Sequence, residues 1–408
     1  MRLADLGDPA GTWQYAERYL SGGTRTYSRY AADLEVDPEH HPQHGAASFR
    51  VPTFWVGPER GSYLAGGTPS PLPARYRDGD RFLLPVHPGA LAVPAVAADL
   101  AGCRPGPPAE VVPSANARTV FVLRLGGEPV PLHFLKLHYP KRLSRFTRRL
   151  RRPVIALQLW VAGELARIGA PVLPELAGGV VGSDPAQAWG FLVRGAQLPG
   201  GGSWPVTVPL FALYGRDVRA PADPTLLEQL IVDSGEDPQQ WLLARLLAPM
   251  IGLWADALLR TGCAIELHGQ NTLLSLSADL RTSRVGYRDC AVYIDPAIRA
   301  ERGLGPDLPP RNVISRDVRP PRSQVLSLVY DSFLGHHTLA FVARLAQQRF
   351  GVPPAALHDA ARKLFAGAVA ARAGPADLLP ETVYYYDDRL HPDGGWALVD
   401  TGEVPHWR

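Results

Sequence analysis

Residues 246–276 read LLAPMIGLWADALLRTGCAIELHGQNTLLSL, and this stretch sets the expected fold. Its first half is the longest apolar run in the chain. Because it is too short to cross a bilayer and is interrupted by Asp256, it predicts a buried helix. From Ile265 the pattern changes to that of a strand, and VGYRDCAVYIDP (285–296) predicts a second strand. The segment therefore predicts a helix, a polar loop and a β-hairpin.

A second hairpin is expected on the N-terminal side, in VVPSANARTVFVLRLGGEPVPLHFLKLHYP (111–140). VFVLRL and LHFLKL are short, β-rich and joined by the turn residues GGEP. Helices are expected in GTWQYAERYL (11–20), in VIALQLWVAGELARIG (154–169) and over 323–373, whereas 299–322 should be a loop and the C-terminal tail irregular. The predicted fold class is α+β, with an antiparallel, palm-like sheet and a mostly helical C-terminal part.

Composition excludes several classes of protein. Of 408 residues, 46% are hydrophobic and 20% charged, which is typical of a globular chain and not of a disordered one. The 40 glycines and 41 prolines show no period, so they indicate turns and not collagen. A net charge of +3 gives no global field for nucleic acid or a membrane, and we expect neither as a partner. Three widely spaced cysteines and a start without an apolar segment predict a cytoplasmic protein.

The strongest local signal is Glu266-Leu-His268-Gly-Gln270-Asn271, followed by Arg288-Asp289. A loop between a buried helix and two strands can aim such side chains at a ligand from a rigid base. An Asn and an Asp on opposed strands can hold Mg²⁺, which prefers oxygen ligands, and His268 could bond a phosphate or act as acid or base. The alternative is a polar turn in which His268 caps the preceding helix.

A cationic cluster is expected where Ser114-Ala-Asn116-Ala-Arg118-Thr119 meets Lys136 and Arg148. Three cations on one sheet edge would suit a polyphosphate or polycarboxylate, because Arg gives forked contacts and Lys a point charge. The chain has only three lysines, so the lysine at 136 is slightly more informative than usual. Alternatively Lys136 is an ordinary exposed strand residue, and the basic run 141–152 is a solvated helix face or a nucleic-acid patch.

Histidines give a weaker signal. His41 and His44 have HxxH spacing and precede Arg50, but no further metal ligand is obvious, so a polar loop is the alternative. His87 follows a predicted strand, where a lone histidine is more often structural.

Together these pieces resemble the siderophore synthetases that work without a peptide-synthetase assembly line, the NIS or aerobactin-synthetase-like family. ELHGQNTLL…RDCAV, SANARTV…LKL and LLPVHPGAL occur in the family's order and rough spacing, from about His41 to Asp289. HHPQHGAASFR resembles the family's H-P-x-H-P-x-x-K-x-R loop, with Gly45 and Ser48 in place of the proline and the lysine.

The resemblance implies Mg²⁺ and an ATP site carried by the antiparallel sheet. By position, the ATP-binding residues would be Asn116, Arg118, Thr119, Lys136, Arg148, His268, Gln270, Asn271 and Asp289. Lys136, Arg148 and His268 would be catalytic, and these three with Arg118 would neutralise the phosphates. Glu266 and Asp289 would hold Mg²⁺, while His41, His44, Arg50 and His87 would bind the substrate.

This chain departs from the family pattern as a short, divergent member. Family members are commonly near six hundred residues. Asn116 replaces the usual serine, Ser144 replaces a threonine, and LLPETVYYYDDRL (378–390) has tyrosines where a lysine is expected. The expected division is a truncated N-terminal region (1–80), a β-rich ATP-binding part (81–225) and a helical C-terminal part with the HGQN hairpin (226–408). Family members often form homodimers, which the sequence neither supports nor opposes.

The implied reaction is a two-step ligation. A carboxylate, citrate or dicarboxylate-like, attacks the α-phosphate of ATP to give an acyl-adenylate, and an amine, hydroxylamine or alcohol then attacks the acyl carbon. One rival interpretation is a kinase-like phosphotransferase, although position 270 is Gln where such a loop would have its catalytic Asp. The other is a non-catalytic nucleotide-binding homologue.

Overall fold

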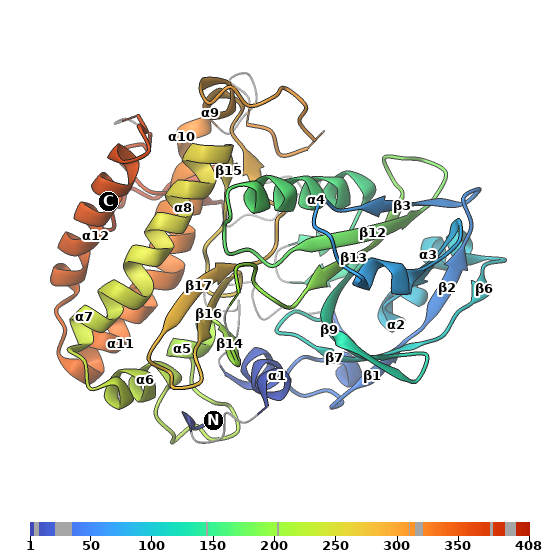
Figure 1. The fold of residues 1–408 in the computed structure, drawn as a ribbon, viewed down its shortest axis with the longest axis horizontal. Helices are drawn as coiled ribbons and strands as arrows, with labels where there is room; N and C mark the ends of the chain where they lie inside the picture. The colour runs from blue at the N-terminus through green and yellow to red at the C-terminus, as the bar shows by residue number, and fades with distance from the viewer. Residues whose placement is uncertain are drawn as a thin grey trace.

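The computed structural model describes residues 1–3, 8–20, 35–143, 146–201, 204–309, 311–314, 321–375, 378–387 and 397–408. Ser144 lies outside these residues, so its predicted role is not assessed. The chain forms a strand-rich part and a helix-rich part, which lie side by side in Figure 1. The fold is α+β with antiparallel sheets, as the sequence predicts.

The largest sheet in the described part of the chain has seven strands, all paired antiparallel. In spatial order they are β1 (Phe49–Val51), β7 (Ala109–Pro113), β8 (Thr119–Leu125), β9 (Glu128–Leu137), β13 (Trp189–Gly195), β12 (Glu175–Val181) and β3 (Gly61–Ala65). Its strands come from both sides of residue 80, where the sequence places a boundary. The three-part division stays a prediction.

The hairpin predicted between 119 and 137 is confirmed as β8 and β9. Gly126 and Gly127 have φ angles of 62° and 89° in the turn, a region that is open to glycine and costly for other residues. The pairing places Lys136 opposite Thr119 and next to Leu192 of β13. Lys136 therefore lies on a central strand and not at an edge.

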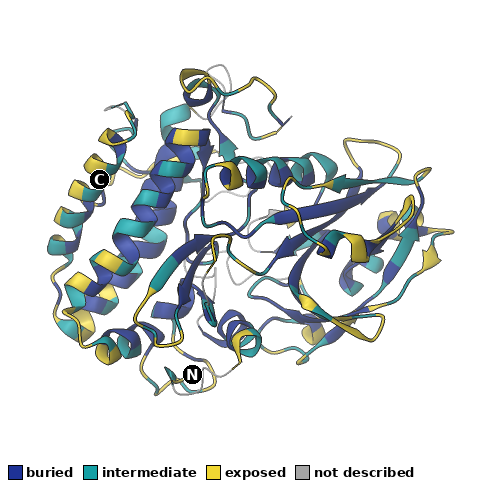
Figure 2. Cartoon of the chain, viewed as in Figure 1, coloured by how far each residue is buried: buried dark blue, intermediate teal, exposed yellow. Residues whose placement is uncertain are grey.

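A four-stranded antiparallel sheet packs on one face of the large sheet through a shared apolar core that includes Phe82 and Phe191. Its order is β4 (Arg77–Asp78), β5 (Arg81–Pro85), β2 (Thr53–Val56) and β6 (Arg104–Pro105). The other face of the large sheet packs against α1 (Pro9–Tyr19) and α4 (Arg152–Arg167). Figure 2 shows these strands as mostly buried, so the sheet is a rigid support for side chains at the ends of its strands.

The predicted buried helix is confirmed. It runs from Pro238 to Thr261 as α7 (Pro238–Leu242), a π-helical turn η5 (Leu243–Leu247) and α8 (Ala248–Thr261). Asp237 caps its first turn, and Gly262 ends it with a φ angle of 76°. By length and apolar composition alone this helix could cross a membrane, but most of its apolar window is buried inside the fold, as in a core helix.

Around α8 lie the other helices of the C-terminal part (Figure 1). They are α10 (Arg322–Ser327), the π-helix η6 (Leu328–Leu339), α11 (Ala340–Phe350) and α12 (Pro354–Ala370). The predicted hairpin after α8 forms a three-stranded sheet, in the order β14 (Val206–Pro209), β16 (Thr272–Leu276) and β17 (Ser283–Tyr287).

Short elements complete the described chain. They are η3 (Pro38–His40), η4 (Leu72–Tyr76), α2 (Pro88–Leu91), α3 (Pro94–Leu100), β10 (Tyr139–Leu143), β11 (Phe146–Arg148), α5 (Phe211–Tyr214), α6 (Leu226–Ser234), β15 (Cys263–Ala264), β18 (Tyr293–Ile294), α9 (Pro296–Glu301), β19 (Tyr384–Tyr386) and β20 (Leu398–Asp400).

Two expectations are corrected here. The basic run is not a helix face, because its first part forms the β10–β11 hairpin. The tail is not irregular throughout, because β19 pairs with β20. The tail is also anchored: Trp407 is buried, and the Arg408 guanidinium pairs with the buried carboxylate of Asp331 at 2.8 Å.

Candidate active site

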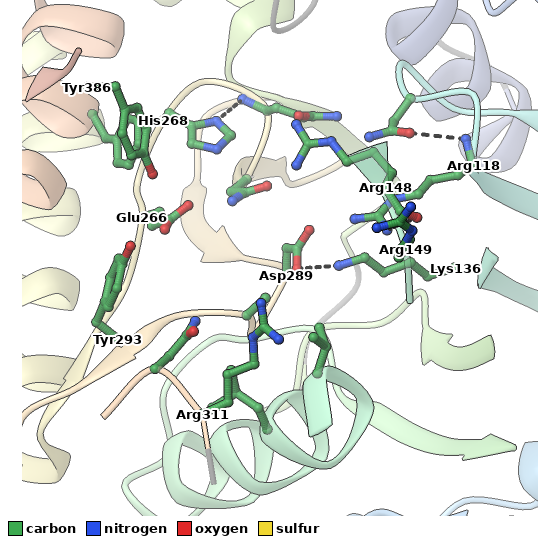
Figure 3. A pocket seen from close by; sticks show the side chains of 18 of the residues that line it. Arg118, Lys136, Arg148, Arg149, Glu266, His268, Asp289, Tyr293, Arg311 and Tyr386 are labelled. Carbon is green, nitrogen blue, oxygen red and sulfur yellow. Dashed lines mark hydrogen bonds and ion pairs between the residues drawn. The ribbon is translucent and has the colours of Figure 1, made fainter. Parts of the chain in front are cut away.

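A polar cavity of about 300 Å³ opens where the end of the large sheet meets the helical part, a volume in the range of ligand pockets (Figure 3). The cavity is lined by side chains from separate parts of the chain: the β7–β8 loop, β9, β11, α4, the HGQN loop, the segment after β17, η6 and β19. They are Asn116, Arg118, Lys136, Thr147, Arg148, Arg149, Val154, Leu157, Glu266, His268, Gln270, Asn271, Asp289, Ala291, Tyr293, Arg311, Asn312, Phe333, Tyr385 and Tyr386.

An ion pair between Lys136 and Asp289 lies at the centre of this cavity. The Lys136 Nζ is 2.6 Å from the Asp289 Oδ1 and also donates to the Gln158 Oε1 at 2.7 Å. Lys136 is 2% exposed, so it is not an ordinary surface lysine. Burial lowers its pKa to about 8, against the opposing effect of Asp289. Burial disfavours the Asp289 carboxylate, but Lys136 and Arg194 outweigh it and hold the pKa of that group well below its usual range.

Local backbone geometry sets the position of Asp289. Its φ angle is 76°, an uncommon value for a residue other than glycine. The Tyr287 hydroxyl donates to the Asp289 carbonyl at 2.8 Å, and the Arg288 N–H donates to the Asn271 carbonyl at 2.9 Å. These bonds hold the HGQN loop and the RD segment together, and such backbone conformations cluster at functional sites.

Cations dominate the wall on the sheet side. Arg118 and Arg148 lie together, with the Arg118 Nη1 donating to the Arg148 carbonyl at 3.1 Å. Burial and the neighbouring Arg148 lower the pKa of Arg118 to about 9. The Arg118 Nε is buried and has no hydrogen-bond partner among the described residues. With Lys136, Arg149 and Arg311 also on the lining, positive side chains outnumber carboxyl groups, and the cavity suits a polyanion.

His268 is neutral near pH 7, because burial lowers its pKa to about 4. Its Nδ1 accepts from the Gln270 N–H at 3.3 Å, so the proton belongs on Nε2. The ring would therefore contribute a hydrogen bond to a phosphate, and the expected neutralising charge would come from the arginines and the lysine.

The end of the cavity that faces the helical part is lined by aromatic rings, which the sequence did not reveal. Rings of Tyr293, Phe333, Tyr385 and Tyr386 line it, and Figure 3 shows Glu266 between Tyr293 and Tyr386. Burial, and then the negative Asp289, raises the pKa of Glu266 to about 8.

The structure brings together most of the predicted nucleotide-contacting residues, although they come from segments far apart in sequence. All of them line the cavity except Thr119, which is buried one residue beyond Arg118. Their roles stay predictions. Arg149, Arg311 and the four rings are additional lining residues; the only hint in the sequence is the run of tyrosines near the C-terminus.

The predicted substrate-binding residues do not line this cavity. His41 stacks on His44 with ring centroids 4.9 Å apart, and Arg50 is exposed on the edge strand β1. His87 is fully buried, and its Nδ1 accepts from the Gly89 N–H at 3.0 Å, capping α2. This cap agrees with the structural alternative for His87, and substrate binding by the four residues stays a prediction.

The donor set at the RD segment suits a nucleotide-bound Mg²⁺. Within the described ranges, no group of three or more His, Cys, Asp or Glu side chains could hold a metal ion by itself. Mg²⁺ usually takes one or two carboxylates from a protein and keeps phosphate oxygens and waters as its other ligands. Asp289, with the Asn271 amide on the same cavity, offers such oxygens. The predicted pairing of Glu266 with Asp289 is not tested.

Comparison with known proteins identifies the fold. No curated protein matches the sequence. A family model described as ferric iron reductase FhuF-like transporter matches residues 239–387, less than half of the chain.

Among solved structures, ATP-bound aerobactin synthetase IucA from Klebsiella pneumoniae is similar with a TM-score of 0.65 and 16% identity, over 89% of this chain and 71% of that one. The petrobactin biosynthesis protein AsbB from Bacillus anthracis is similar with a TM-score of 0.69 and 14% identity, over 97% and 74%. Aerobactin synthetase IucC from Klebsiella pneumoniae has a TM-score of 0.58 and 20% identity, over 88% and 73%. The chain therefore has the fold of the siderophore synthetases, as its sequence motifs predict.

Proposed function

We propose that this chain, which has the siderophore-synthetase fold, is an ATP-dependent ligase of siderophore or related natural-product biosynthesis in the cytoplasm. It adenylates a carboxylate, citrate or dicarboxylate-like, and condenses it with an amine, hydroxylamine or alcohol. The observation that carries the proposal is the cavity itself, where residues predicted from two separate motifs converge on the ion pair of Lys136 with Asp289. That ATP-bound IucA has the same fold supports a nucleotide at this site.

The first step needs stabilisation of phosphate charge and alignment of the attacking carboxylate. Arg118, Lys136 and Arg148 bind the phosphates, with Lys136 as a point charge and the arginines as forked donors. His268 donates a hydrogen bond. When bound, Mg²⁺ would neutralise further phosphate charge, held on the protein by Asp289. The carboxylate oxygen attacks the α-phosphorus and pyrophosphate leaves.

In the second step the nucleophile attacks the acyl carbon of the adenylate, and AMP leaves with the electron pair of the broken bond. Lys136, His268 and Asn271 are buried in the cavity wall, which limits the water that could hydrolyse the adenylate there.

The proposal is tested by the identity of the nucleotide product. Purified protein is incubated with ATP, Mg²⁺, a panel of carboxylates beginning with citrate, and a panel of amines and alcohols, and AMP, ADP and pyrophosphate are quantified separately. We expect AMP and pyrophosphate that depend on the carboxylate. ADP would instead identify a phosphotransferase, and bound ATP without turnover across the panel would identify a binding homologue.

A further inference from the structure

The carboxyl group of Glu266 is unusual among the charged side chains of the cavity. No hydrogen bond or ion pair to it occurs within the described part of the chain, whereas Asp289 is bound to Lys136. Figure 3 shows Glu266 on the side of Tyr293 and Tyr386, away from the Lys136–Asp289 pair. A half-buried carboxyl group that opens into a cavity without a protein donor is free to accept hydrogen bonds from a ligand.

The rings around Glu266 form a continuous wall. The Phe333 centroid is 6.1 Å from that of Tyr386 and 6.5 Å from that of Tyr385, and the two tyrosine rings are 5.5 Å apart at 60°. Tyr293 closes the opposite side. Ring faces attract cations, most strongly where water is excluded, and rings combined with a carboxylate are a common arrangement for binding alkylammonium groups.

Backbone contacts hold this wall in place. Phe333 belongs to the π-helix η6, an uncommon form that is frequent at functional sites. The Ser332 hydroxyl donates to the Tyr384 carbonyl at 2.7 Å, and the Tyr384 N–H donates to the Ser327 hydroxyl at 3.1 Å. These bonds connect β19 to η6 and to the preceding helix α10, so the tyrosines and Phe333 are positioned as one unit.

Arg311 lies on the cavity rim, where its positive charge acts on Tyr293. It is exposed, and Figure 3 shows its side chain extending toward Asp289 and not toward Tyr386. The lining is therefore ordered along the cavity, with the cations Arg118, Lys136 and Arg148 at one end, Arg311 in the middle, and Glu266 with the rings at the other end.

We infer that the ring-lined compartment around Glu266, Tyr293, Phe333 and Tyr386 binds the nucleophile of the ligation as an alkylammonium ion. This rests on the proposed function, because it selects an amine from the amines, hydroxylamines and alcohols that the ligation could use. Glu266 accepts the ammonium hydrogen bonds and the rings surround its charge. The inference concerns recognition before the chemical steps and adds no step to them.

The inference is tested by direct binding, without nucleotide and with EDTA, so that neither ATP nor Mg²⁺ contributes. 1,5-Diaminopentane and 1,5-pentanediol, which match in length, are titrated into the full chain by calorimetry. We expect the diamine to bind at least about tenfold more tightly than the diol, because a hydrogen bond to a charged group is the larger contribution. Equal affinities would overturn the inference.

Variants locate the binding site. Glu266→Gln should weaken diamine binding by about tenfold or more. Tyr386→Leu should weaken it by about two- to fivefold, and Tyr386→Phe, which keeps the ring, should restore most of that loss. Tyr384→Leu is the matched control, since Tyr384 precedes these tyrosines on β19 but does not line the cavity. Unchanged diamine affinity in Glu266→Gln would refute the inference.

Two further outcomes separate the competing roles of this compartment. If adenosine displaces the diamine, the rings form a nucleobase slot. If Glu266→Gln weakens Mg²⁺–ATP binding but not diamine binding, Glu266 is a metal ligand, as first predicted. Either result overturns the inference. Carboxylate-dependent pyrophosphate exchange needs no amine, so it tests the ligase proposal independently of these titrations.

Discussion

Replacing Lys136 by methionine removes one buried positive charge and keeps nearly the same volume. Two unit charges about 4 Å apart interact by about 4 kcal/mol at an effective dielectric constant of about 20. Lys136 already has a partner in Asp289 at 2.6 Å, so part of this energy is offset when a phosphate binds. A loss of about 3 kcal/mol in the transition state corresponds to a decrease of about 100-fold in kcat/KM.

The variant should still fold. Arg194 Nη2 lies 3.9 Å from the Asp289 Oδ1 and remains as a partner for the carboxylate. The matched control is Lys363→Met, because Lys363 is exposed on α12 and does not line the cavity. The assay measures AMP formation, together with thermal unfolding with and without tripolyphosphate, which should stabilise the wild type more than Lys136→Met. Full turnover in Lys136→Met, or an equal loss in Lys363→Met, would refute the reasoning.

Further predictions concern stability. Besides His268, the histidines His87, His133 and His138 are buried and neutral, because burial lowers their pKa values to between about 3 and about 4. The unfolded chain takes up these protons at a higher pH than the folded chain does. The free energy of unfolding should therefore be at its full value above about pH 6.5 and fall as the pH decreases toward about 4, by up to about 1.4 kcal/mol per histidine per pH unit. A free energy of unfolding in urea that stays constant over this pH range would contradict this. Arg408→Ala should cost about 3–5 kcal/mol in the same assay, because it leaves the Asp331 carboxyl buried without its partner; a change below about 1 kcal/mol would show that the tail anchor is not needed. Gly190→Ala should cost about 3 kcal/mol or more, because a Cβ there would lie 1.7 Å from the Gly179 carbonyl oxygen; a normal melting temperature would show that the two strands can separate.

Local sequence patterns were sufficient to predict the helix and strands that carry most of the site residues. The alternation in VFVLRL and LHFLKL and the two glycines between them predicted the hairpin with Lys136, and the apolar run before Gly262 predicted the core helix. These features depend on residues close in sequence, so short-range rules describe them.

The ring-lined end of the cavity could not be predicted in the same way. Tyr385 and Tyr386 lie on a three-residue strand whose position depends on hydrogen bonds to α10 and η6, more than fifty residues earlier. The π-helical form of η6 leaves no simple periodic signal, and its consequence for Phe333 is a matter of tertiary packing. The ion pair of Lys136 likewise depends on Asp289, which follows a strand of a different sheet, β17.

The measurement that tests the central claim most directly is exchange of labelled pyrophosphate into ATP, with Mg²⁺ and a carboxylate but without any amine or alcohol. Exchange isolates the first half-reaction, in which the carboxylate displaces pyrophosphate at the cavity around Lys136 and Asp289. The account predicts exchange that requires the carboxylate and is lost in Lys136→Met but kept in Lys363→Met. Absence of exchange across the carboxylate panel in a protein that binds ATP, or release of ADP instead, would contradict it.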